Sequence, residues 1–165
     1  MRTLKRRRKE NKTDYLKRFK LLKSGLPRIV FRKTNKYLIA QYVISEEAKD
    51  KTDTGITSKI LLKYGWPENF KGSLKSTPAS YLTGLLIGKK VIDNKKETPI
   101  ADFGMLRVLS KSKVHAFLKG LVDSGVKIKC KEENFPKEDR IFGKHLKKDF
   151  SKIFEKIKSK IQEKR

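Results

Sequence analysis

The chain has 165 residues, of which 43 are Lys or Arg and 18 are Asp or Glu, so its net charge is +25. Its single cysteine excludes an internal disulfide and a zinc knuckle built on cysteines, and it fits a reducing cytoplasm. A hydrophobic content of 36% is enough for the core of one domain, but the charge predicts a partner of opposite sign, either nucleic acid or an anionic membrane surface.

The positive charge is concentrated at the two ends. Residues 1–36 hold 15 Lys/Arg against two acids, and residues 144–165 hold nine against three, so these 58 residues carry +19 of the +25. This distribution favours binding of a polyanion over a solubilising coat. The membrane alternative is weak because apolar runs such as Leu85–Ile87 are far shorter than the roughly 18 residues of a spanning helix. No hydrophobic region follows the N-terminal charges, so we expect no secretory signal.

Residues 1–24 are predicted to form a basic arm and a short helix. Met1–Asn11 has no periodicity, and we expect it to be disordered without its partner. Thr13 is expected to cap the helix, which Gly25-Leu26-Pro27 ends. The apolar residues of this helix are predicted to share one face, with the cations on the other: Leu16, Phe19 and Leu22.

Residues 25–131 are predicted to form the core domain, which begins with a β-hairpin. Its strands are Arg28–Thr34 and Lys36–Ile44, joined by a tight turn at Thr34-Asn35. Both strands carry apolar residues on both faces, so we expect them to be central and covered on two sides. A polar loop over residues 46–53 and a short third strand over Thr54–Ser58 are expected to follow.

Strands alternate with helices in the rest of the core. Thr77-Pro78 predicts the start of one helix, and Ser112 that of a second helix stopped by Gly125. Strands are expected at Pro99–Phe103 and Val126–Cys130. The alternation predicts an α/β fold with a mixed sheet.

Residues 132–165 are predicted to form a connector and a basic amphipathic helix. The apolar residues recur at steps of three and four, with lysines between them: Leu146, Phe150, Ile153, Phe154, Ile157 and Ile161.

Enzymatic and nucleotide-binding sites find little support. Gly84–Lys90 resembles a phosphate loop, but its glycines are one residue too close and it lies within a predicted helix, where its glycines would instead let the helix lie close on the sheet. The two histidines have no ligand spacing. A nuclease needs carboxylates converging on Mg²⁺, and we interpret Asp102 and Asp123 as salt-bridge or capping residues. We expect no metal and no cofactor.

Basic residues interleaved with aromatic ones give the positive signal, which indicates binding of RNA. Arg6-Arg7-Arg8-Lys9 alone is not specific, but the cations continue onto predicted ordered structure as far as Lys36. Tyr15, Tyr37 and Trp66 are candidate stacking surfaces, with core packing as the alternative. Asn35 and Gln41 are candidates for reading base edges or for satisfying polar groups of the turn and sheet.

Five blocks of sequence, in order, resemble those of large-subunit ribosomal protein eighteen in its archaeal form, the relative of eukaryotic large-subunit protein five. They are NKTDYLKRFKLLKSGLPRIVFRKTNKYLIAQ, KYGW with STPASYLTGLLIGKK, ADFGMLR, KSKVHAFLKGLVDSGVKI and PKEDRIFGKHL. The loop Pro67–Ser76 is longer than usual in that family, a departure that bears on the RNA contacts expected over the stretch from Trp66 to Lys75.

The resemblance implies a three-layer α/β/α core and a structural, non-enzymatic role in the large ribosomal subunit. It implies binding of 5S rRNA in the central protuberance, attachment to the large-subunit rRNA, and contact with large-subunit ribosomal protein five of the bacterial and archaeal naming. An RNA-processing nuclease on a related scaffold is the alternative. The residues expected to contact RNA, from the basic pattern and the resemblance together, are Arg6, Arg7, Arg8, Lys12, Thr13, Tyr15, Lys17, Arg18, Lys20, Lys23, Arg32, Lys33, Asn35, Lys36, Trp66, Lys75, Arg140 and Lys144.

Overall fold

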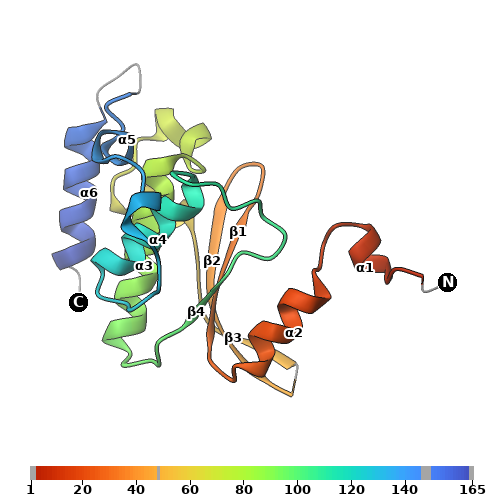
Figure 1. The fold of residues 1–165 in the computed structure, drawn as a ribbon. Coiled ribbons are helices and arrows are strands. Elements are labelled where there is room, and N and C mark those ends of the chain that lie inside the picture. Colours follow the sequence, from red (N-terminus) through yellow and green to blue (C-terminus); the bar gives the residue numbers. More distant parts are fainter. Residues whose placement is uncertain (1–2, 48, 146–149, 164–165) are drawn as a thin grey trace.

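A four-stranded mixed sheet organises the fold (Figure 1). The computed structural model describes residues 3–47, 49–145 and 150–163. The strands are β1 (Arg28–Lys33), β2 (Leu38–Glu46), β3 (Lys49–Thr57) and β4 (Ile100–Asp102). Their order is β3-β2-β1-β4, with β1 antiparallel to β2, β2 antiparallel to β3, and β1 parallel to β4. The predicted α/β class and mixed sheet are confirmed.

The hairpin of β1 and β2 lies at the centre of the sheet, as predicted, but its connection differs. Lys33 pairs with Leu38, so four residues form the loop, and the Thr34 N–H donates to the Tyr37 carbonyl over 2.9 Å. The polar loop predicted for residues 46–53 is wrong, because most of it belongs to the nine-residue strand β3. β3 is an edge strand with little burial, so its sequence lacks the apolar alternation that signals a strand.

Two helices cover one face of the sheet: α3 (Thr77–Asp93) and α4 (Lys113–Asp123). The cap of α3 is Ser76, one residue before the predicted Thr77, and its hydroxyl accepts the Ala79 N–H. Ser112 stands at the N-cap of α4, as predicted. Phe31 of β1 reaches the layer of these helices, with its ring centroid 4.5 Å from that of Phe117.

The glycines of α3 lie against α4, not against the sheet as the sequence suggested. A Cβ on Gly84 would stand 2.3 Å from the Phe117 carbonyl oxygen, and one on Gly88 1.9 Å from Ser124 Oγ. Gly120 of α4 makes the reciprocal approach, since its Cβ would lie 2.2 Å from the Tyr81 carbonyl oxygen. Hydrogen in place of a side chain therefore lets the two backbones touch.

The C-terminal helix α6 (Ser151–Glu163) packs on the side of α3 that faces away from the sheet (Figure 1). Phe154, Ile157 and Ile161 are buried as the predicted stripe requires, and Phe150 is buried just before the helix, whereas Leu146 lies outside the described residues. The strand predicted at Val126–Cys130 is wrong, since the structure assigns no strand there. Val126 is buried and Ile128 half-buried, so this alternation reflects one-sided packing of an extended segment that joins no ladder. The remaining elements are η1 (Ser58–Tyr64), η2 (Glu68–Ser73), η3 (Glu132–Asn134) and α5 (Glu138–Phe142).

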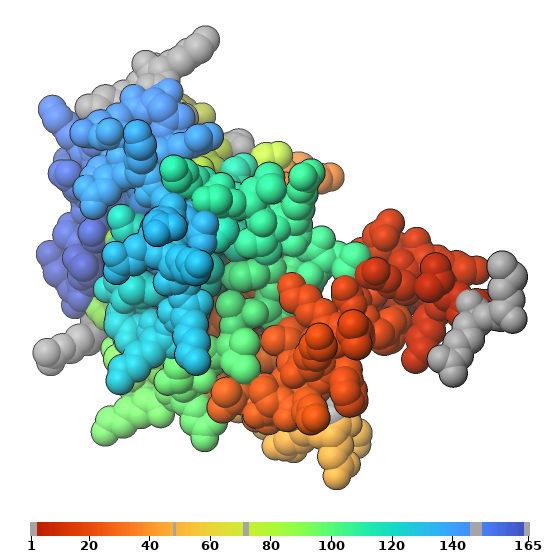
Figure 2. All heavy atoms as spheres, viewed as in Figure 1, coloured from red at the N-terminus to blue at the C-terminus, as the bar shows by residue number. Residues whose placement is uncertain are grey.

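The N-terminal segment lies on the other side of the sheet, so helices flank the strands on both sides (Figure 1). It contains α1 (Arg6–Lys9), a short helix in an arm expected to lack fixed structure, and α2 (Tyr15–Lys23). The cap of α2 is Asp14, not Thr13, and its carboxylate accepts the Lys17 N–H over 3.2 Å. Figure 2 shows this segment projecting from the side of the body. In the described part of the chain, no helix is long and apolar enough to cross a membrane.

Candidate nucleic-acid interface

Polar contacts attach α2 to the fold. The Lys17 ammonium donates to the Gly104 carbonyl over 3.3 Å, and the Arg18 guanidinium donates to Asp50 over 2.9 Å. Both partners lie far along the chain, one after β4 and one in β3. These contacts fix Lys17 and Arg18, two cations of the basic arm, on the side of the sheet opposite α3 and α4. Both side chains are half-buried, so each one contacts the protein and is also open to solvent.

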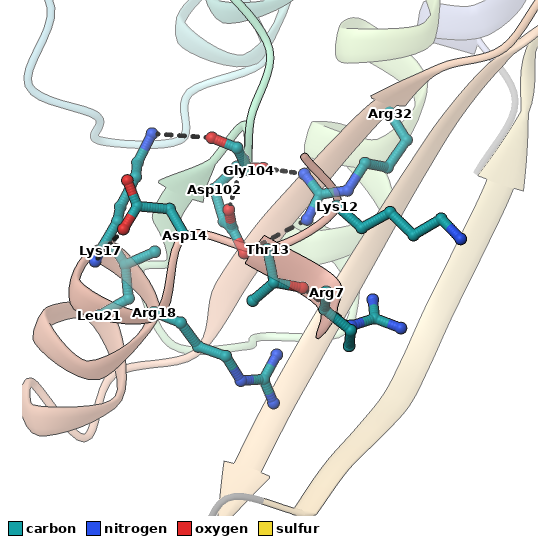
Figure 3. Close-up of a pocket in the computed structure, with 10 residues that line it drawn as sticks. All are labelled: Arg7, Lys12, Thr13, Asp14, Lys17, Arg18, Leu21, Arg32, Asp102 and Gly104. Atoms are coloured by element: carbon teal, nitrogen blue, oxygen red, sulfur yellow. Dashed lines mark hydrogen bonds and ion pairs between the residues drawn. The ribbon is translucent and has the colours of Figure 1, made fainter. Parts of the chain in front are cut away.

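A cavity of about 140 Å³ opens where the arm meets β1 and β4 (Figure 3). Six of the residues predicted to contact RNA line it, together with two carboxylates, a leucine and a glycine. The lining residues are Arg7, Lys12, Thr13, Lys17, Arg18 and Arg32, then Asp14, Asp102, Leu21 and Gly104. Figure 3 shows that they come from three segments distant in sequence, so the fold gathers them into one cationic surface, here called the arm pocket.

Arg32 is the cation of this pocket held most directly by the sheet. Its Nη1 donates to the carbonyls of Phe31 and Asp102 over 3.1 and 3.2 Å, and the Asp102 carboxylate lies 3.7 Å from its Nη2. Gly104 leaves the space for it, because a Cβ there would stand 2.9 Å from the guanidinium carbon. The side chain remains 41% exposed, so an anion can approach the guanidinium from solvent.

A buried arginine lies on the same face of β1. Arg28 is 2% exposed and donates to Asp102 over 3.1 Å and to Asp50 over 2.6 Å. Asp50 also accepts the Ser45 hydroxyl and the Arg18 guanidinium. This network joins β1, β3, β4 and α2, so it fixes the frame on which the arm rests.

The network predicts a pH dependence. Burial alone would raise the pKa of Asp50, but hydrogen bonds from Ser45 and Arg18 and the charges of Arg28 and Arg18 outweigh it, so the pKa lies below 3.8. A carboxyl with a depressed pKa stabilises the fold above its unfolded pKa, and this stability is lost as the pH falls through the folded value. We expect Asp50→Asn to lower the free energy of unfolding at pH 6 more than at pH 3. Urea titrations at both values measure this, and an equal loss at both would contradict it.

The remaining cations of the arm point into solvent or pair with nearby acids. Lys12 lies 2.7 Å from Glu10, and Arg8 lies 3.7 Å from Asp14. Arg7 donates to the Thr13 hydroxyl over 2.9 Å, which places Thr13 beneath a cation. The other residues predicted to contact RNA in the arm and at the hairpin loop are exposed: Arg6, Lys20, Lys23, Lys33, Asn35 and Lys36.

A second cationic surface lies on the opposite side of β1. Successive residues of a strand point to opposite faces, so Arg32 lines the arm pocket while Lys33 lines a cavity of about 410 Å³ at the start of α4. This α4 groove is lined by five cations, among apolar residues, and none of its described lining residues is acidic: Lys33, Arg107, Lys111, Lys113 and Arg140. Burial and the charges of Lys33 and Lys75 lower the pKa of Lys113, so like charges are crowded there.

Comparison with known proteins identifies the family to which the chain belongs. Residues 1–102 match the family described as ribosomal large subunit proteins 60S L5 and 50S L18. The chain is 43% identical over 141 residues to the large ribosomal subunit protein uL18 of Methanoculleus marisnigri, an alignment that covers 86% of this chain and 78% of that protein. The uL18 proteins of Methanoregula boonei and Korarchaeum cryptofilum are each 42% identical over 86% of this chain and over 79% and 70% of their own lengths.

The chain belongs to this family of large-subunit ribosomal proteins. Its role is therefore structural, within the ribosome of the cytoplasm, and it is not an enzyme. The nuclease alternative is accordingly wrong. The described residues contain no group of three or more His, Cys, Asp or Glu able to hold a metal ion. Among these residues Asp102 pairs with Arg28, as predicted, whereas Asp123 accepts the Tyr81 hydroxyl over 2.6 Å instead of forming a salt bridge or a cap.

Trp66, one of the residues predicted to contact RNA, is buried in the core. Trp66 is only 3% exposed, its Nε1 donates to the Phe70 carbonyl over 3.1 Å, and its ring packs 4.7 Å from that of Phe150. Trp66 therefore belongs to the core and offers no surface on which a base could stack. Tyr15 is 37% exposed, with the Lys5 ammonium 4.7 Å from the centre of its ring.

Three cations of the α4 groove were missed in the sequence: Arg107, Lys111 and Lys113. The signal available was Lys111-Ser112-Lys113, two cations beside a helix cap, where backbone N–H groups also favour anions. Of the predicted residues, Arg140 lines this groove and Lys75 lies within electrostatic reach of Lys113, whereas the exposed Lys144 pairs with Asp139 over 2.9 Å.

Proposed function

We propose that this protein binds 5S rRNA and helps attach it to the large-subunit rRNA in the central protuberance, beside large-subunit ribosomal protein five. The observation that carries the proposal is the arm pocket, where six residues predicted to contact RNA line one surface on a fixed frame. The net charge of +25 and membership of the family support it.

The mechanism is charge neutralisation on a preformed shape. Each phosphate contact steepens the salt dependence of binding by roughly 0.7–0.9 log units per decade, so several contacts dominate the affinity. Shape then discriminates among RNAs, because the arm pocket and the α4 groove lie on opposite sides of β1 and are fixed relative to each other. Two cationic surfaces facing different ways suit a protein that contacts two segments of RNA.

We expect tighter binding of 5S rRNA than of transfer RNA in a filter-binding assay at near-physiological salt. Both RNAs offer many phosphates, so charge alone binds both, and only surface fit favours one. The assay should be repeated over a range of salt, since affinity without the salt concentration has no clear meaning. Equal affinity for both RNAs would reduce the interface to non-specific attraction and would contradict the proposal.

A further inference from the structure

Helix α2 turns Leu16 and Phe19 outward beside exposed lysines, whereas the sequence predicted apolar residues and cations on opposite faces. Leu16 is 67% exposed and Phe19 is 64% exposed, whereas Lys17 and Arg18 are half-buried. Residues three and four apart share a face of a helix, so two exposed lysines lie beside this apolar pair. The four residues are here called the outer face of α2: Leu16, Phe19, Lys20 and Lys23.

The rotation of α2 is fixed by the contacts of its inner face. Lys17 donates to the Gly104 carbonyl, Arg18 to the Asp50 carboxylate, and Asp14 caps the first turn. Turning the helix to bury Phe19 would break the contacts of both cations. The arm pocket and the exposed apolar pair are thus two consequences of one orientation.

An exposed pair of large apolar side chains beside cations indicates the chemistry of what covers it. The sequence of α2 contains no acidic residue, and Lys20 and Lys23 point into solvent beside Phe19. The complementary partner is negatively charged and presents flat apolar surfaces. RNA meets both conditions where its bases are unpaired, because in a duplex the flat faces of the bases are stacked against one another and are not exposed.

We propose that the outer face of α2 binds an unpaired segment of RNA, with a base stacked on Phe19 and adjacent phosphates at Lys20 and Lys23. This assignment rests on the proposed function and adds a residue outside the predicted RNA contacts. An aromatic platform accepts any base, so Phe19 contributes affinity while the lysines contribute the salt dependence.

The test compares four variants of the full chain, three at Phe19 and one at Lys23, in 5S rRNA filter binding over a range of salt. Phe19→Ala is expected to weaken binding roughly 5- to 150-fold, the effect of losing one stacked base, with an unchanged salt slope. Phe19→Trp should retain the affinity, whereas Phe19→Leu, which keeps apolar area without a ring, should lose most of it. Lys23→Ala is the matched control, because it should lower the salt slope by about 0.7–0.9. Phe19 is exposed, so circular dichroism should show all variants folded.

The outcomes separate this inference from the proposed function. If the unmodified protein shows no preference for 5S rRNA, the proposed function fails, whatever Phe19 does. If the preference holds and Phe19→Ala binds as well as the unmodified protein, the stacking assignment is wrong and the function stands. If Phe19→Leu retains full affinity, the contact is apolar rather than stacking, which also overturns the assignment. Loss of a ribosomal protein contact by Phe19→Ala, with RNA affinity unchanged, would assign the outer face of α2 to protein.

Discussion

Replacing Gly84 by alanine is expected to lower the free energy of unfolding by about 3 kcal/mol or more, at the upper end of overpacking costs. The added Cβ would stand 2.3 Å from the Phe117 carbonyl oxygen and 3.1 Å from its carbonyl carbon. Both atoms are backbone within α4, so no side chain can turn away and the two helices must separate. Alanine's higher helix propensity offsets only about 1 kcal/mol of this. Urea unfolding followed by circular dichroism measures the change.

Gly55→Ala is the matched control, because its new Cβ would meet nothing closer than side-chain carbons at 3.7 Å. Gly55 lies on the exposed edge strand β3, and we expect its substitution to change the free energy of unfolding by less than about 1 kcal/mol. If both variants unfold at the same urea concentration, the close contact of α3 and α4 is wrong.

The glycines of α3 illustrate how far sequence reasoning reaches. The caps and apolar periodicity of α3 and α4 are local signals, so both helices were predicted near their observed positions. Two glycines four residues apart indicate that another element packs closely on that face of the helix, but their spacing does not say which element it is. Whether Gly84 meets the sheet or another helix depends on the order in which the layers stack, which no single helix encodes.

The orientation of α2 was not predictable for a related reason. Helical spacing predicts that Leu16 and Phe19 share a face apart from the cations, and burial of apolar area normally turns such a face toward the protein. In the structure the outcome is set by Gly104 and Asp50, which lie 87 and 32 residues away from their partners Lys17 and Arg18. Polar contacts with such distant residues leave no trace in the periodicity of the helix itself.

In the candidate interface, too, the sequence predicted one part and missed another. Cations are dense in sequence from the N-terminal arm to the hairpin, so five cations of the arm pocket were named in advance, and Thr13 with them. The α4 groove combines Lys33 with Arg107 and Arg140, which only the fold brings together. Trp66 was predicted to contact RNA but is buried, because an aromatic residue in a loop can pack into the core as well as lie on the surface.

Removal of the Asp102 carboxylate is expected to have a similarly large effect, through the buried Arg28. Truncating one partner of a buried ion pair costs about 3–5 kcal/mol, since the other charge remains without its compensation. Arg28 is 2% exposed and would keep Asp50 and Ser45, so we expect Asp102→Ala to fall near the lower end of that range. The free energy of unfolding in urea measures this loss.

Glu10→Ala is the control, because it removes an acid whose side chain is 39% exposed and whose cation partners, Arg6 and Lys12, are exposed as well. Exposed pairs contribute between 0 and about 1 kcal/mol, so a loss in Asp102→Ala no larger than in Glu10→Ala would contradict the buried network.

The RNA affinity of Asp102→Ala distinguishes two roles for Asp102. Removing a negative charge from the arm pocket would tighten binding if charge alone mattered. We expect weaker binding, because the Asp102 carboxylate lies 3.7 Å from the Arg32 guanidinium and 3.1 Å from that of Arg28, and its loss removes the ion pairs that order both cations. The Asp102 carboxylate therefore favours RNA binding by holding cations in position, although its own negative charge repels RNA.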